Sequence, residues 1–209
     1  MRSLFIRGLI VASGLILTLP GISTGASRCT IKGTPGNDVL NGTAGNDIIC
    51  AGAGDDVVRG GPGNDVIRAG RGADVVHGDR GDDRIKGGRG SDQLFGDEGS
   101  DVVRGGRGRD TIRGYLGGDR ILGGRGGDEL YGGPGTDVVR GGSGGDLARG
   151  GIDNDHIHGG LHADRLIGWA GDDIIDGVDG VEGNDELRGS TGTDTCTADP
   201  NDSVKRCEQ

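Results

Sequence analysis

The feature that most constrains this chain is a repeat of nine residues that begins at Gly33. The first blocks read GTPGNDVLN, GTAGNDIIC, AGAGDDVVR and GGPGNDVIR. The register holds through sixteen uninterrupted blocks to Asp176, skips three residues, and resumes for two blocks that end at Thr197. Eighteen blocks at one fixed period indicate stacked repeats of one structural unit rather than an ordinary globular core.

Three positions of the nine-residue block are nearly constant in residue type. The first is Gly except at Ala51 and Ala69, and the fourth is Gly except at Asp153 and His162. The eighth is aliphatic in seventeen blocks and is Cys196 in the last. Glycines permit positive φ and let carbonyl groups converge in a turn, whereas an apolar residue near the end of the block suits a strand. Each block therefore predicts a turn followed by a short strand whose middle side chain points inward.

The sixth position is Asp in every block. Asp supplies a hard anionic oxygen, and Ca²⁺ accepts six to eight oxygens of mixed carboxylate and carbonyl origin, whereas Mg²⁺ demands near-octahedral geometry. The alternative, that these side chains only cap turns, does not require Asp over Asn or Ser in every block. The candidate metal ligands are Asp38, Asp47, Asp56, Asp65, Asp74, Asp83, Asp92, Asp101, Asp110, Asp119, Asp128, Asp137, Asp146, Asp155, Asp164, Asp173, Asp185 and Asp194.

This pattern resembles GGxGxDxUx, the nonapeptide of the RTX (haemolysin-type) calcium-binding proteins, and the resemblance covers about four-fifths of the chain. It implies an all-β fold, a parallel β-roll (a right-handed β-solenoid) with two blocks in each coil. It also implies that the six-residue turns bind Ca²⁺ and that the last three residues of each block form a strand. Nine coils with strands about 4.8 Å apart would make a rod of roughly 43 Å.

In such a roll the stacked neighbours are alternate blocks, so Asp38 is expected above Asp56, and Asp47 above Asp65. The apolar columns are thin, and the many glycines lose much backbone entropy on folding. Successive carboxylates within each of the two columns also repel one another until a cation lies between them. Calcium binding and folding are therefore expected to be one process.

Composition narrows the function further. The chain has 50 Gly among 209 residues, 2% aromatic residues and a net charge of −10. Removing the first 26 residues removes two arginines and no acid, which leaves 21 positive against 33 negative residues, or −12. This balance argues against nucleic acid as a partner and favours cations.

The N-terminus predicts export. Arg2 and Arg7 precede an apolar run from Gly8 to Leu19, which is followed by small residues ending at Ala26. This order is typical of a signal peptide, the run is too short for a membrane span, and no other segment suits one. We expect a secreted protein, extracellular or at the cell surface. The expected organisation is a signal peptide (1–26), an N-terminal cap (27–32), the β-roll (33–197) and a C-terminal cap (198–209).

The four cysteines lie in two pairs near the ends of the mature chain. In an exported protein, proximity favours disulfides Cys29–Cys50 and Cys196–Cys207 among three possible connectivities, and zinc ligation lacks a CxxC spacing. The register separates Cys29 from Cys50 by about 10 Å, beyond the roughly 7 Å limit for a disulfide. That bridge is therefore expected to require the first strand to leave register.

The repeat weakens near its C-terminal end. The side chain of Asp153 or His162, where other blocks have glycine, is expected to alter or abolish the local metal site. The insertion of residues 177–179 is expected to form a bulged turn, which leaves the metal sites after it in doubt. His156 and His158 occupy outward positions and are interpreted as surface residues rather than metal ligands.

These observations favour a free-standing calcium-binding protein without catalytic activity, because the chain has no HExxH motif and no converging catalytic set. The alternative is a cell-surface adhesin or polysaccharide-binding β-roll. A basic row at outward positions would suit an anionic surface or polysaccharide, or would only offset nearby carboxylates. This row contains Arg68, Lys86, Arg104, Leu122, Arg140 and His158.

Overall fold

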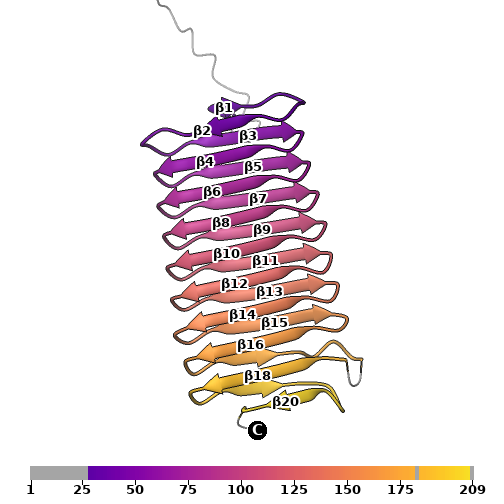
Figure 1. Ribbon diagram of the computed structural model, residues 1–209. Helices are drawn as coiled ribbons and strands as arrows, with labels where there is room; N and C mark the ends of the chain where they lie inside the picture. Colours follow the sequence, from indigo (N-terminus) through magenta and orange to yellow (C-terminus); the bar gives the residue numbers. More distant parts are fainter. Residues whose placement is uncertain (1–27, 182–183, 208–209) are drawn as a thin grey trace, which may run out of the picture.

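The described part of the chain is a β-solenoid of short strands stacked into two parallel sheets (Figure 1). The computed structural model describes residues 28–181 and 184–207, so the expected signal peptide lies outside the described residues. Among these residues, no helix is long and apolar enough to cross a membrane. The all-β parallel fold expected from the repeat is confirmed.

Each sheet contains ten of the described strands, and successive strands of the chain alternate between the sheets. The odd sheet is formed by β1 (Ile31–Lys32), β3 (Ile48–Ala53), β5 (Val66–Arg71), β7 (Arg84–Arg89), β9 (Val102–Arg107), β11 (Arg120–Arg125), β13 (Val138–Ser143), β15 (His156–Leu161), β17 (Ile174–Asp176) and β19 (Thr195–Thr197). The even sheet is formed by β2 (Val39–Asn41), β4 (Val57–Pro62), β6 (Val75–Arg80), β8 (Gln93–Glu98), β10 (Thr111–Leu116), β12 (Glu129–Pro134), β14 (Leu147–Ile152), β16 (Arg165–Ala170), β18 (Glu186–Thr191) and β20 (Ser203–Lys205).

The eighth-position side chains form the core between the sheets. Strands up to β17 pair so that residues eighteen apart are neighbours, and most of these side chains are completely buried. The three inserted residues widen this spacing to 21 in the pairs β16–β18 and β17–β19. This confirms the expected inward columns, in which Leu40, Val58 and Val76 stack in one sheet and Ile49, Ile67 and Ile85 in the other.

Most strands are longer than the three residues implied by the repeat, and that expectation is wrong. In β9, for example, pairing continues past Arg104 through Gly106 and Arg107, which are the second and third residues of the next block. Burial alternates along the strand, with Val103 and Gly105 buried and Arg104 exposed. The first-position glycine therefore faces inward too, where the absence of a side chain lets the strand continue toward the turn.

The roll also has one more coil than the nine that we counted from the sequence. β1 precedes the first block, and β20 follows the last and pairs with β18, where Val204 lies beside Leu187. Val204 packs against the core. Residues 202–205 repeat the Asp-x-aliphatic-x half of the block, which extends the even sheet by one strand.

Both expected disulfides are present, Cys29–Cys50 and Cys196–Cys207, with Cα atoms 5.8 and 5.7 Å apart. The expectation that the first bridge needs β1 to leave register is wrong, because Ile31 pairs with Ile49 in register. The chain departs from the repeat only before Thr30, which brings Cys29 next to Cys50.

Candidate metal centre

The sixth-position Asp residues stand at the end of each turn, directly before a strand, and form two columns along the roll. Except at Asp185 and Asp194, which end the two columns, the backbone N–H of each Asp donates to Oδ1 of the Asp in the next coil, over 2.7 to 3.1 Å. The first column contains Asp38, Asp56, Asp74, Asp92, Asp110, Asp128, Asp146, Asp164 and Asp185. The second contains Asp47, Asp65, Asp83, Asp101, Asp119, Asp137, Asp155, Asp173 and Asp194. The stacking expected for Asp38 over Asp56 and Asp47 over Asp65 is confirmed.

The second carboxylate oxygen of these residues lacks a partner. Sixteen of the eighteen Asp side chains have a buried Oδ2 that accepts no hydrogen bond from the described residues. Buried polar atoms are normally satisfied, and each unsatisfied one costs on the order of 1–3 kcal/mol, more when it is charged. A regular series of such atoms indicates oxygens that face a ligand.

The first-position glycine leaves open the space that these oxygens face. A methyl group on Gly123 would lie 2.5 Å from Asp128 Oδ2 and 2.7 Å from the carbonyl oxygen of Gly141 in the next coil. A carboxylate oxygen and a carbonyl oxygen therefore converge beside Gly123. The same convergence recurs along both columns and gives a physical reason for glycine at this position.

Burial makes the ionised form of these carboxylates unfavourable without a cation. It raises the pKa of fifteen of them above the usual 3.8, and the pKa of Asp83 and Asp155 reaches about 8. Repulsion from neighbouring Asp residues adds to this effect at both positions. A bound divalent cation would offset both causes.

The first coil differs from the rest. Thr43 occupies the second position of its block, where its N–H and its hydroxyl donate to Asp47 Oδ2 over 2.7 and 2.8 Å. Thr34 contacts Asp38 in the same way. The hydrogen bonds from Thr43 lower the pKa of Asp47. These two carboxylates are thus satisfied within the protein, a difference that the constant sixth position did not reveal.

The columns continue through the part where the repeat weakens. Asp153 and His162 adopt positive φ angles of 80° and 84°, like the glycines that they replace. Asp164 donates its N–H to Asp185 across the three inserted residues, and Asp185 remains buried. The first column even extends past the last block, because Asp202 Oδ1 accepts the N–H of Asp185 at 3.2 Å. The Asp-x-aliphatic-x sequence at Asp202 is the signal that could have identified this extension.

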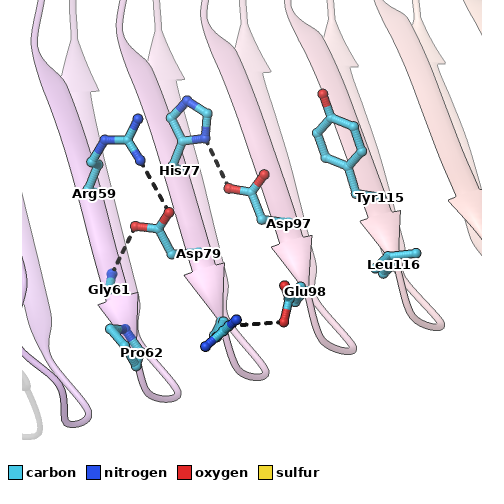
Figure 2. A pocket seen from close by; sticks show the side chains of 10 residues that line it. Arg59, Gly61, Pro62, His77, Asp79, Asp97, Glu98, Tyr115 and Leu116 are labelled. Carbon is cyan, nitrogen blue, oxygen red and sulfur yellow. Dashed lines mark hydrogen bonds and ion pairs between the residues drawn. The ribbon is translucent and has the colours of Figure 1, made fainter.

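A second group of possible ligands lies on the outer face of the even sheet (Figure 2). One ligand atom from each of His77, Asp79 and Asp97 lies within 4.8 Å of the others. The Arg59 guanidinium already pairs with Asp79 at 3.3 Å, and His77 Nδ1 lies 3.0 Å from Asp97 Oδ2. A fixed cation beside Asp79 disfavours a metal ion there, so we assign none.

The buried columns thus offer only oxygen atoms, carboxylate and carbonyl, which is the ligand set that Ca²⁺ prefers. Comparison with known proteins agrees with this chemistry. The family model described as RTX calcium-binding nonapeptide repeat (4 copies) matches residues 30–58, 51–85, 59–94, 77–112, 95–130, 113–148, 149–181 and 178–202. The comparison with curated proteins gave no match. The matched segments together cover most of the chain, which therefore belongs to the RTX calcium-binding nonapeptide repeat family.

Proposed function

We propose that this chain is an exported calcium-binding protein whose β-roll folds when Ca²⁺ binds to the Asp columns. The observation that carries the proposal is the series of sixteen buried, unpartnered Oδ2 atoms. The proposed ligands are these sixteen Asp residues, from Asp56 to Asp194. Asp38 and Asp47 are lesser candidates because Thr34 and Thr43 already satisfy their carboxylates.

The bound ion supplies positive charge that the columns lack. Each column has eight unpartnered carboxylates and therefore seven intervals between successive coils, which sets an upper limit of fourteen ions. Mg²⁺ suits these positions less well than Ca²⁺, because it demands near-octahedral geometry and dehydrates reluctantly. The Asp residues of the roll hold their carboxylate oxygens in position for the ion. Because these carboxylates are buried, the fold depends on the cation to neutralise them.

Export and the absence of catalysis complete the proposal. The signal-like N-terminus and the disulfides Cys29–Cys50 and Cys196–Cys207 suit an oxidising compartment outside the cytoplasm, where calcium is plentiful. The carboxylates of the columns are buried side by side and serve binding rather than acid or base chemistry. The proposed role is that of a binding and structural module.

Calcium binding is tested by equilibrium dialysis of residues 27–209 with radioactive calcium. We expect several ions per chain, retained against equimolar Mg²⁺. Binding of less than one Ca²⁺ per chain, or equal displacement by Mg²⁺, would contradict the proposed ligand set.

A further inference from the structure

The outer face of the odd sheet carries a basic groove that the calcium columns do not explain. The groove has two parallel rows of side chains that run along the roll, across strands β5 to β13, and its volume is about 1070 Å³. The ninth-position row contains Arg68, Lys86, Arg104, Leu122 and Arg140, of which Arg68, Lys86 and Leu122 line the groove itself. The third-position row contains Arg71, Arg89, Arg107, Arg125 and Ser143.

All eight cations of these rows are exposed, and none forms an ion pair with a carboxylate of the described residues. The five strands contain two further arginines, Arg84 and Arg120, and no acidic residue. The even sheet is different, because Arg59 pairs with Asp79 (Figure 2) and Arg80 pairs with Glu98. Of the basic row seen in the sequence, His158 lies 3.1 Å from Asp176, whereas the cations from Arg68 to Arg140 pair with no carboxylate of the described residues.

Glycine forms the floor between the two rows. The second position is glycine in every strand of the groove, for example Gly88 in β7 and Gly106 in β9, with positive φ. On the even sheet this position is glycine in β4, β12 and β14 but carries Asp79, Asp97 and Tyr115 in β6, β8 and β10, where φ is also positive, at 75° to 77°. The odd face thus keeps an open floor along all five coils from β5 to β13, whereas side chains interrupt the floor of the even face.

We propose that the basic groove binds an extended acidic polysaccharide, of the uronate class, along the long axis of the roll. Arginine pairs well with planar carboxylates through two parallel hydrogen bonds. Successive arginines of the third-position row, from Arg71 to Arg125, lie about 4.8 Å apart, close to the advance of one sugar along an extended chain. The two rows lie about 10 Å apart, so a flat sugar ring rests on the glycine floor between them.

Other polyanions fit this face less well. Single-stranded nucleic acid binds to basic grooves that also provide aromatic side chains for base stacking. The aromatic residues of the described chain all lie on even strands: Phe95 in β8, Tyr115 in β10, Tyr131 in β12 and Trp169 in β16. A flat lipid surface would contact the arginines at the rims and leave the glycine floor unused.

The test compares two variants of the calcium-loaded protein that lose the same charge. The groove variant replaces the third-position row by glutamine (Arg71→Gln, Arg89→Gln, Arg107→Gln and Arg125→Gln). The control variant replaces four paired arginines (Arg59→Gln, Arg80→Gln, Arg109→Gln and Arg165→Gln), whose ion pairs lie outside the groove. The probe is a fluorescent galacturonate hexasaccharide, which is too short to gel with calcium, and the readout is anisotropy.

We expect the hexasaccharide to bind the wild type, and binding to weaken as salt is raised. The groove variant should bind about 30-fold more weakly, since each of four exposed ion pairs contributes a little over twofold. The control variant should stay within about twofold of the wild type. A third variant with lysine at the same four groove positions should bind more tightly than the glutamine variant but more weakly than the wild type, because lysine keeps the charge and loses the paired hydrogen bonds of arginine. Circular dichroism of each variant in calcium verifies that all are folded.

Three results would overturn the proposal. They are no binding of the hexasaccharide by the wild type, equal loss of affinity in the groove and control variants, and tighter binding of oligo-dT or phosphatidylglycerol vesicles than of the hexasaccharide. Calcium content measured on the same samples separates these outcomes from failure of the calcium sites.

Discussion

Replacement of one buried column carboxylate should have opposite effects with and without calcium, and Asp92→Asn is the sharpest case. Asp92 is 1% exposed, its Oδ1 accepts the N–H of Asp74 at 3.0 Å, and its Oδ2 lacks a partner. Asparagine retains the amide oxygen that accepts this hydrogen bond. The substitution therefore removes mainly the charge and one anionic oxygen.

The magnitude without calcium follows from the pKa of Asp92, which burial raises from 3.8 to about 7. Because the pKa in the folded state is above that of the unfolded chain, ionisation destabilises the fold as pH rises through about 7. At pH 8 this penalty is about 4 kcal/mol, and Asp92→Asn removes it. In calcium the variant instead lacks one partner of a buried charge pair, which costs on the order of 3–5 kcal/mol.

The assay follows circular dichroism at pH 8 in two titrations. In calcium, urea unfolds the folded protein, and in EDTA the osmolyte TMAO induces folding of the unfolded chain. Asp92→Asn should lower the urea midpoint in calcium and should fold at less TMAO in EDTA. The matched control is Asp82→Asn, since Asp82 is exposed and its Oδ1 accepts the N–H of Ser100 at 2.9 Å, as an asparagine would. Destabilisation of both states by Asp92→Asn, or equal effects of the two variants, would refute the reasoning.

Further expectations concern protons, the core and the C-terminal disulfide. In EDTA, acidification from pH 8 to about 5 should increase the β signal. The reason is that buried carboxyls such as Asp83 have a pKa raised to about 8, so the metal-free fold loses stability as pH rises through that value. An unchanged or weaker signal at pH 5 would contradict this. Ile112→Ala should cost about 2–4 kcal/mol in calcium by urea unfolding, whereas Ile152→Ala, at a side chain 53% exposed, should cost under about 1 kcal/mol. Cys207→Ser removes the Cys196–Cys207 disulfide, which should lower the free energy of unfolding by about 3 kcal/mol and speed hydrogen exchange in β20. Full protection of β20 in that variant would show that the disulfide does not anchor this strand.

The sequence was sufficient to predict the features that repeat one residue type at one step. The inward columns of Val58 and Ile67 and the stacking of Asp38 over Asp56 follow from a period of nine with two blocks in each coil. Register in such a roll is strict because a slip would remove both the core and the carboxylate ladder. Periodicity therefore identified the candidate ligands, whereas the parallel roll with two blocks in each coil was an expectation from the resemblance to RTX repeats.

Other features depend on contacts that the pattern does not encode. Glycines such as Gly105 and Gly106 are typical of turns, so the continuation of β9 through them left no sequence signal. The path of Cys29 to Cys50 depends on a departure from the repeat outside the blocks. That the groove arginines have no carboxylate partner among the described residues depends on the distances between rows and sheets, which sequence spacing does not give.

We propose that calcium binding and folding of this chain are one process, and the most direct test measures both on residues 27–209. Far-ultraviolet circular dichroism and hydrodynamic radius should show an expanded chain with little β signal in EDTA. A steep transition to a compact β-rich state is expected in millimolar calcium and not in magnesium, since each ion orders the coils for the next. A compact β-rich chain that persists in EDTA, after metal analysis has shown that no calcium remains bound, would contradict the account.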